Sequence, residues 1–294
     1  MWNNKSFLSN MEEIVMMKIT RAYVHSAVFH ADDVFSTALL KILCPGIEIV
    51  RTLKVPELGE TEICYDIGGG PYDHHQEMEY RDEEQTKPYA ALGKLWRAFG
   101  HELVDDEGWK MIDESLIVPI DQHDNGMGDG NSVLSKLVTF MNPNWDEPAT
   151  EEDRRKKFDE AVDFATTVLE KYLSKARSTT KAVKAFDEAD VIDGRIIHLS
   201  SFAPWKDVIK QYRTDSEVIL AVYPSSRGGY CIETISSCKY PLPYAWTKEL
   251  PEGMTFCHIS RFLAATTTEE YAIEYAMEAL EKIMARSDPN TKNE

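Results

Sequence analysis

The stretch Tyr65–His75 reads YDIGGGPYDHH and begins inside an apolar run, Ile63 to Ile67, that has strand character. It places a carboxylate, Asp66, at the strand end, then three glycines, and then an acid beside two adjacent imidazoles. Glycine is needed where a backbone bends sharply or approaches a ligand closely, and Asp and His are ligands that suit first-row divalent metals. A strand end, a glycine turn and a ligand cluster together predict the rim of an active site in an α/β sheet. A polar surface loop would have the same local sequence, so other segments must decide between the two.

Length and composition predict a globular protein of two domains. At 294 residues the chain can form two domains that each bury a core. We expect a poorly ordered leader at residues 1–18, a metal-binding catalytic domain at 19–186 and a smaller substrate-binding domain at 187–294. No apolar run is long enough to span a bilayer, and no secretory signal is visible. Five cysteines without a Cys-x-x-Cys pair argue against disulfides and thiolate zinc, and for a reducing cytoplasmic compartment.

The formal net charge of −18 restricts the partners. Long nucleic acids are bound mainly by neutralising their phosphates, and an acidic surface opposes that. Either the ligand is small, or metal ions and a local basic patch supply the positive charge. Of these we favour a short oligonucleotide or a nucleotide, and we expect neither a long duplex nor a membrane as partner. A homodimer stays open.

The order of the expected elements is that of an α/β protein. A strand at residues 19–25 precedes a helix through Val34 to Ile42, which stops at Pro45-Gly46, and further strands follow at 47–53 and 62–67. Strand–helix–strand–strand order predicts a largely parallel sheet. Beyond it we expect helices at 89–99, 107–121 (with Pro119 as a kink), 132–140, 150–185, 205–212 and 268–285, and α+β texture from strands at 195–200, 217–223, 230–235 and 254–260.

Ligand-type residues concentrate in the first 124 positions, where they end expected strands or begin the helices that follow. They are His25, His30, Asp32, Asp33, Asp66, Asp73, His74, His75, Asp121, His123 and Asp124. Parallel strands bring such positions to one edge of the sheet. The mixture of imidazoles and carboxylates favours Mn²⁺, Fe²⁺ or Co²⁺ over Mg²⁺. There are enough ligands for two ions that share one carboxylate.

Several members have a simpler interpretation. His25 could be a core histidine at a strand end, and Asp33 reads more readily as a helix N-cap or surface acid than as a ligand. Asp73 could serve only to orient a neighbouring imidazole, and His123 reads as a loop residue. Taken singly these signals are weak, whereas three groups at one sheet edge form a strong pattern.

Three motifs occur in a recognisable order. The first has a His and, five residues on, a His-x-Asp-acid (His25 and His30 to Asp33). The second is Asp-x-Gly-Gly followed by Tyr-Asp-His-His-Gln (66–69 and 72–76), and the third is Ile-Asp-x-x-Asp-Asn-Gly (120–126). Pro204-Trp-Lys206, Gly228-Gly229, Pro241-Leu-Pro243 and Phe256-Cys-His258 also fit. Across residues 19–286 the chain therefore resembles the melanocyte-proliferating-gene-one family of metal-dependent hydrolases, within the DHH phosphoesterase superfamily.

The resemblance implies a fold and an activity. It implies an N-terminal, DHH-like, largely parallel sheet flanked by helices, a smaller C-terminal α+β domain, and an active site in the cleft between them. It also implies a hydrolase of phosphodiester bonds that uses water activated by two metals. The expected activity is that of a 3′–5′ exonuclease on short RNA or of a nucleotide phosphodiesterase. Two Mn²⁺ ions are the expected cofactor, with Mg²⁺, Co²⁺ and Fe²⁺ as the other options.

The resemblance also implies roles for individual residues. One metal would be held by His25, His30 and Asp66, and the other by Asp32, Asp66, His74 and one of Asp121 or Asp124. Asp66 and His75 would be the catalytic residues, and His75, His258 and Arg261 would contact the substrate. Asp33 and Asp73 would support the ligands.

One segment departs from the family pattern. Where the family has Ser-Gly-Phe and then a Gly-Gly pair, this chain has Ser260-Arg261-Phe and then Ala264-Ala265. The added β-carbons narrow the range of backbone conformations at a loop that the resemblance implies binds phosphate, and we expect Arg261 to replace amide contacts with a guanidinium contact. Two alternatives therefore stay open. One is a hydrolase of small anhydrides such as pyrophosphate with the same metals, and the other is a non-catalytic, metal-containing binding protein.

Overall fold

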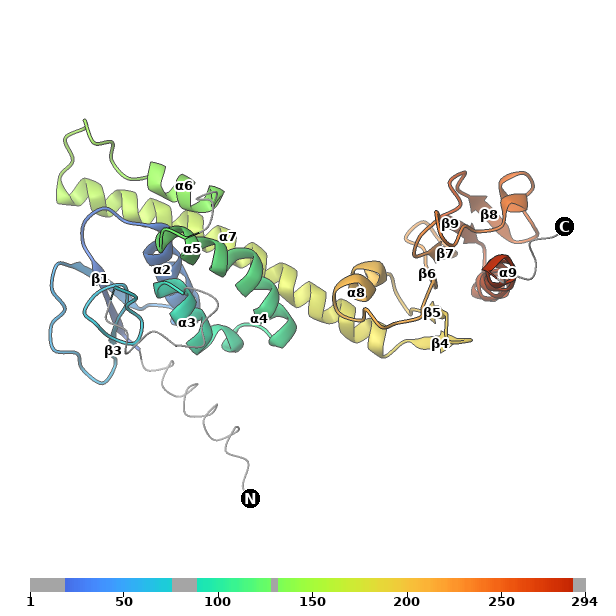
Figure 1. Cartoon of the computed structure of the whole chain (residues 1–294), viewed down its shortest axis with the longest axis horizontal. Coiled ribbons are helices and arrows are strands. Elements are labelled where there is room, and N and C mark those ends of the chain that lie inside the picture. Colours follow the sequence, from blue (N-terminus) through green and yellow to red (C-terminus); the bar gives the residue numbers. More distant parts are fainter. Residues whose placement is uncertain (1–18, 76–88, 128–131, 288–294) are drawn as a thin grey trace, which may run out of the picture. The chain divides into compact units, whose positions relative to one another are not determined.

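The structure, a computed structural model, describes residues 19–75, 89–127 and 132–287 (Figure 1). The expected leader at 1–18 lies outside this part of the chain. Two compact units are present, unit 1 ending at Ser178 and unit 2 beginning at Thr179. The division falls inside the long helix α7 (Glu151–Asp187), and each unit is described by itself.

Unit 1 contains the parallel sheet that the sequence predicts. Its strands are β1 (Arg21–His25), β2 (Glu48–Thr52) and β3 (Glu62–Cys64), in the order β2-β1-β3. Both neighbours run parallel to β1, with Arg21 level with Glu48 on one side and Glu62 on the other. Tyr65 continues the ladder past β3, because its N–H donates to the carbonyl of Tyr23. All three strands therefore present their carboxyl ends at the same edge, which is where the ligand-type residues follow.

Helices surround α2 (Ala31–Leu43), whose residues 31–40 are all buried. α3 (Ala91–Phe99), α5 (Val118–Asp124) and α6 (Val133–Phe140) pack against it (Figure 1). The N-terminal part of α7 completes the unit 1 core with a buried stripe at helical spacing, formed by Phe158, Ala161, Val162, Ala165, Leu169 and Leu173.

One expected helix is interrupted. Residues 107–121 were expected to form a single helix, but the structure has α4 (Asp106–Ile112), a π-helical turn (Asp113–Ile117) and then α5. Pro119 lies in the first turn of α5, where its missing N–H is tolerated. The backbone stays helical from α4 through the π turn into α5, so Pro119 does not end the helix.

Unit 2 is a six-stranded sheet in the order β4-β5-β6-β7-β9-β8. Only β5 and β6 are parallel, and β6 and β7 form the expected hairpin. Its helices include α8 (Trp205–Gln211), a short 3-10 helix (Tyr244–Thr247), α9 (Glu269–Ser287) and the end of α7. α9 packs on β5, β6, β7 and β9. The strands are β4 (Asp190–Ile192), β5 (Ile196–His198), β6 (Leu220–Pro224), β7 (Tyr230–Thr234), β8 (Met254–Cys257) and β9 (Leu263–Thr266).

The segment that departs from the family pattern corrects an expectation. Ala264 and Ala265 do not form a loop, because they lie in β9 between β7 and β8. Ala264 is fully buried in the unit 2 core, where a methyl group contributes apolar contact that glycine would lack. The loop expected at this segment is instead the short turn that joins β8 to β9.

Two further observations bear on the expectations from composition. No helix in the described ranges is long and apolar enough to cross a membrane. All five cysteines are within the described ranges and all are free thiols.

The two glycines of the β6–β7 hairpin allow a matched test of packing. Gly228 and Gly229 both have positive φ, but a β-carbon at Gly228 would meet open space, whereas one at Gly229 would lie 2.0 Å from the carbonyl oxygen of Thr266. Gly228→Ala should therefore cost about 1 kcal/mol of backbone strain, and Gly229→Ala about 3 kcal/mol or more because backbone must also move. Urea unfolding of the two variants measures the difference. Equal losses would contradict the close approach of β9.

Candidate metal centre

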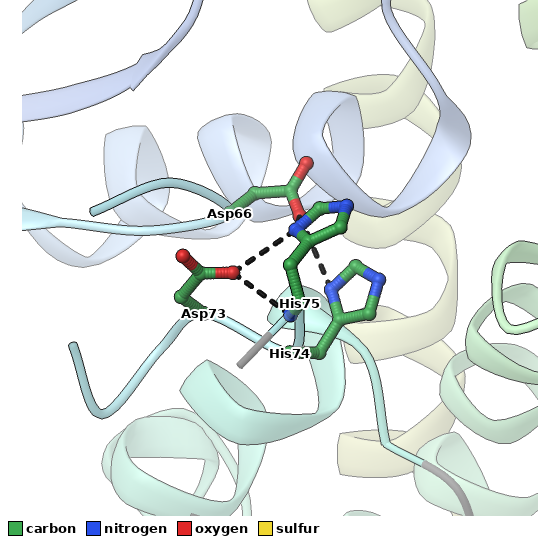
Figure 2. A group of neighbouring side chains, drawn as sticks. All are labelled: Asp66, Asp73, His74 and His75. Atoms are coloured by element: carbon green, nitrogen blue, oxygen red, sulfur yellow. Dashed lines mark hydrogen bonds and ion pairs between the residues drawn. The ribbon is translucent and has the colours of Figure 1, made fainter. Parts of the chain in front are cut away.

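Asp66 is the centre of the cluster and adopts an unusual backbone conformation. Its φ is +55°, in the left-handed region that Asp tolerates better than most residues with a β-carbon. The conformation is held because the Asp66 N–H donates to the carbonyl of Tyr72 across the glycine turn. Within that turn Gly68 and Gly69 also have positive φ. The Asp66 carboxylate is thereby buried and directed towards the imidazoles of His74 and His75 (Figure 2).

The two oxygens of Asp66 face different histidines. Oδ2 lies 3.0 Å from Nε2 of His25, at the end of β1, and Oδ1 lies 3.1 Å from Nδ1 of His74. Oδ1 also lies 3.5 Å from Nδ1 of His75 (Figure 2). The Asp66 carboxylate therefore lies between the imidazoles of His25 and His74.

A second carboxylate, Asp124, completes the other side of the cluster. Its Oδ2 lies 2.9 Å from Nε2 of His74, and its Oδ1 lies 3.6 Å from Nδ1 of His30. Asp32, in the first turn of α2, lies 3.8 Å from Nδ1 of His74 through its Oδ2. The cluster contains three groups of donor atoms that lie close enough together to hold an ion. They are His25, Asp33 and Asp66; His30, Asp32 and Asp124; and Asp66, Asp73, His74 and His75.

Buried oxygens in the cluster lack hydrogen-bond donors. Both oxygens of Asp32 and of Asp66, and Oδ2 of Asp33, accept no hydrogen bond from the part of the chain that the structure describes. The imidazole nitrogens near Asp66 are close enough, but their geometry is not that of hydrogen bonds. Ligands about 2.1 Å from one ion lie about 3 Å from each other, which is the separation found here. A divalent cation is thus the partner that this donor set fits.

The electrostatics of the cluster favour positive charge within it. Burial, followed by the charges of Asp66 and Asp124, raises the pKa of Asp32 well above its usual range. Burial opposes protonation of His25 and His74, but the neighbouring carboxylates outweigh it and raise their pKa values to about 10 and about 9. Burial likewise opposes ionisation of Asp66, yet the same two imidazoles lower its pKa to about 2. Protonated His25 and His74 would therefore offset part of the negative charge of these carboxylates.

Asp121 and Asp124, which the sequence leaves as alternatives, occupy different places. Oδ2 of Asp121 accepts the N–H groups of Ala90 and Gly93, both at 2.8 Å, and so caps the N-terminus of α3 from α5. Ala90 at the N-cap position has no side-chain oxygen of its own, and a β-carbon at Gly93 would lie 2.2 Å from Oδ2 of Asp121. The other oxygen of Asp121 is buried without a partner among the described residues. Of the two, Asp124 is the one whose oxygens lie within 4 Å of nitrogens of His30 and His74, while Asp121 acts on His74 through its charge at longer range.

Asp33 and Asp73 both organise backbone near the ligands. Oδ1 of Asp33 accepts the N–H of His30 at 2.9 Å, while its Oδ2 lies 3.1 Å from Nε2 of His25. Asp33 is fully buried, so its interpretation as a surface acid is wrong. Asp73 accepts the N–H of Gly69 at 2.9 Å and the N–H of His75 at 3.0 Å, and its Oδ1 is 3.0 Å from Nδ1 of His75 (Figure 2).

Two supporting residues were not singled out in the sequence. Asn142 accepts the N–H of Phe29 at 3.1 Å and donates to its carbonyl at 2.9 Å, which anchors the loop before His30. Arg51 donates to the carbonyl of Ala27 at 2.8 Å in the same loop. Asn142 lies in residues 141–148, whose asparagines and prolines predict a connecting loop and give no sign of this contact.

The two predicted substrate-binding residues of unit 2 lie in the β8–β9 turn. Nδ1 of His258 accepts the N–H of Ser260 at 3.0 Å, so in neutral His258 the proton is on Nε2. Arg261 has φ +58° and lies over the ring of Tyr244. Their contact with a substrate stays a prediction.

Comparisons with known proteins agree with the resemblance. The family model for the MYG1 exonuclease family, described as an uncharacterised protein family (UPF0160), matches residues 21–280. A MYG1 protein of Caenorhabditis elegans is 29% identical over 326 residues, which cover 87% of this chain and 94% of the relative. The MYG1 exonuclease of Homo sapiens is 25% identical over 337 residues, covering 90% and 87%. A MYG1 protein of Dictyostelium discoideum is 23% identical over 314 residues, covering 87% and 95%. The chain belongs to the MYG1 family.

Proposed function

We propose that the chain is a metal-dependent phosphodiesterase of the DHH type that acts as a 3′–5′ exonuclease on short RNA. The observation that carries this proposal is the pair of buried carboxylates, Asp32 and Asp66, whose oxygens lack hydrogen-bond donors in the described chain while imidazoles lie beside them. The mammalian relatives named exonucleases support the choice of a nuclease. The five free thiols support a reducing, cytoplasmic compartment.

The donor sets suggest how two ions would be held. His25 and Asp66, with Asp33 beside them, form one set, and His30, Asp32 and Asp124 form the other. The family-derived assignment pairs His30 with His25, but the proximity of His30 to Asp124 favours the second set. His74 adjoins both sets, through Asp66 and through Asp124. Nitrogen and oxygen donors in this mixture suit Mn²⁺ better than Mg²⁺. These donor sets support Mn²⁺ as the proposed cofactor, with Asp66 in the first set and Asp32 and Asp124 in the second.

Divalent ions bound there would supply a nucleophilic hydroxide near neutral pH and offset the charge that develops on phosphate. Side chains of the protein would orient the substrate and transfer protons. The side chain of His75 is 56% exposed, so it can reach a phosphate oxygen and hold or transfer a proton there. Asp73 fixes that ring by lying 3.0 Å from its Nδ1, which leaves Nε2 for the substrate.

A short RNA labelled at its 5′ end tests the function and the role of Asp66. With Mn²⁺ the wild-type protein should shorten this RNA from the 3′ end. Asn tolerates positive φ at least as well as Asp, so Asp66→Asn removes the charge while preserving the turn. It should lower kcat/KM by about 10³-fold, whereas Asp73→Asn should lower it by about 10-fold to 100-fold because Asp73 only orients His75.

Three results of this assay would refute parts of the proposal. Full activity of a folded Asp66→Asn variant would remove Asp66 from the metal site. Cleavage of pyrophosphate in place of RNA would favour the anhydride hydrolase. No turnover of RNA, pyrophosphate or a generic diester with Mn²⁺ would favour a binding protein.

Metal binding should be linked to proton release. His25 and His74, with pKa values raised to about 10 and about 9, carry protons at pH 7 in the metal-free protein. A metal ligand must be a neutral imidazole, so binding displaces these protons, and Mn²⁺ affinity should rise with pH from 6 to 8. Calorimetric titration in two buffers of different ionisation enthalpy measures the number released. Mn²⁺ affinity that does not change with pH would contradict the assignment of both histidines.

Because Asp121 and Asp124 lie in different places, we expect their substitution to have opposite effects on Mn²⁺ affinity and on the metal-free melting temperature. Asp124→Asn should weaken Mn²⁺ binding about 10-fold or more with little change in the metal-free melting temperature. Asp121→Ala should lower the metal-free melting temperature, because it uncaps α3 at a cost of about 1–2 kcal/mol. Thermal unfolding with and without Mn²⁺ separates the two effects. If the reverse pattern is found, Asp121 is the ligand.

A further inference from the structure

Tyr65, the residue before Asp66, has a buried hydroxyl group that the packing of the core does not require. The side chain is fully buried in the unit 1 core. A phenylalanine would fill almost the same space with no polar atom to remove from water, and that removal costs free energy unless the group is hydrogen-bonded. The contacts of the hydroxyl group therefore indicate what it does.

The Tyr65 hydroxyl begins a chain of two hydrogen bonds that ends in the first turn of α2. Its oxygen lies 2.6 Å from Oγ1 of Thr37, which is also buried. Oγ1 of Thr37 donates in turn to the backbone carbonyl of Asp33 at 2.7 Å. A threonine hydroxyl has one proton, and a carbonyl can only accept, so the Tyr65 hydroxyl is the donor to Thr37. Burial raises the pKa of Tyr65, which keeps this donor protonated.

The chain of hydrogen bonds connects the two carboxylates that lie beside His25. Nε2 of His25 is 3.1 Å from Oδ2 of Asp33 and 3.0 Å from Oδ2 of Asp66. Asp66 follows Tyr65 in the sequence, and Asp33 supplies the carbonyl that Thr37 binds. The contacts therefore form a closed ring that contains His25, Asp33, Thr37, Tyr65 and Asp66.

Both ends of Tyr65 are fixed. Its N–H donates to the carbonyl of Tyr23 in β1 at 3.0 Å, and its hydroxyl is bound to Thr37 in α2. The side chain between these two bonds has only two rotatable torsions, so Tyr65 holds the end of the sheet at a constant distance from α2. Because Asp66 adjoins one end of this spacer and Asp33 the other, the spacer restricts how far apart their carboxylates can lie.

We propose that Tyr65 and Thr37 are positioning residues that set the separation of Asp33 and Asp66 for a divalent ion in the donor set His25, Asp33 and Asp66. Neither has an atom in this donor set, so both act through the ligands. Hydrogen-bonded groups behind metal ligands commonly change metal affinity 10-fold to 100-fold. The inference rests on the metal centre of the proposed function, and it does not depend on nuclease activity or on the substrate.

The test measures Mn²⁺ affinity and stability separately in the full-length protein. Calorimetric titration with Mn²⁺ gives Kd, and thermal unfolding without metal gives the melting temperature. Tyr65→Phe and Thr37→Val each break the chain of hydrogen bonds, so each should raise Kd about 10-fold and lower the melting temperature by about 2–4 °C. Thr37→Ser keeps the hydroxyl group and should bind Mn²⁺ like the wild type.

Two hydrogen bonds of the same kinds elsewhere in the chain provide matched controls. Oγ1 of Thr166 in α7 donates to the carbonyl of Val162 at 2.8 Å, and the hydroxyl of Tyr275 in α9 donates to the carbonyl of Glu252 at 2.8 Å. Neither bond involves a residue of the metal centre. Thr166→Val and Tyr275→Phe should therefore lower the melting temperature and leave Kd for Mn²⁺ unchanged.

The double variant Tyr65→Phe with Thr37→Val distinguishes positioning from general stability. Removal of both hydroxyl groups leaves neither one buried without its partner, so most of the lost melting temperature should return. Kd for Mn²⁺ should stay about 10-fold above the wild-type value, because the connection between the sheet and α2 is still broken. Recovery of Kd together with the melting temperature would assign the pair a purely structural role and overturn the inference.

The remaining outcomes distinguish this inference from the proposed function. Wild-type Kd in both single variants, with a lowered melting temperature, overturns the inference and leaves the metal centre intact. A wild-type protein that does not bind Mn²⁺ refutes the metal centre and the inference with it. Weaker Mn²⁺ binding by the single and double variants of a protein that does not hydrolyse RNA supports the inference and refutes only the nuclease activity.

Discussion

The structure depends on keeping several carboxylates buried in one small region. Asp32, Asp33, Asp66 and Asp121 are all removed from water, and the charge of each of the others raises the pKa of Asp32. Like charges in a medium of low polarity repel strongly, so such a group persists only with compensating positive charge. Protonated imidazoles at His25 and His74 supply part of it. A divalent cation would supply more and would thereby also stabilise the folded state, since binding energy that requires the native arrangement adds to folding energy.

Backbone geometry holds these carboxylates in place. Asp66 is presented by a left-handed residue at the start of a glycine turn. Asp32 lies in the first turn of α2, where the helix dipole favours negative charge. The loop before α2 is pinned by Asn142 to the backbone of Phe29. Side chains held this way would lose little conformational entropy on binding an ion, because they already converge.

Sequence reasoning succeeded where local pattern determines structure and failed where distant contacts do. The parallel sheet and the convergence of His25, Asp66 and His74 follow from strand periodicity and from the common edge of parallel strands. The capping of α3 by Asp121 could not be predicted, because it joins residues about thirty positions apart through backbone N–H groups that carry no sequence signal. The strand β9 was missed because an Ala-Ala pair has weak strand propensity, and burial between two partners decides its state.

The π-helical turn at Asp113–Ile117 has a consequence for how this family can change length. A π turn holds one residue more than the regular helix around it. Loss of a single residue there would restore a regular α-helix and leave the downstream turns facing almost as before, because the π turn absorbs its extra residue within one helical turn. Asp121 would stay at the end of α3, and Asp124 would stay beside His30 and His74. The loss of one residue from α5 ahead of Asp121 would instead rotate both side chains by about 100° about the axis and away from these partners.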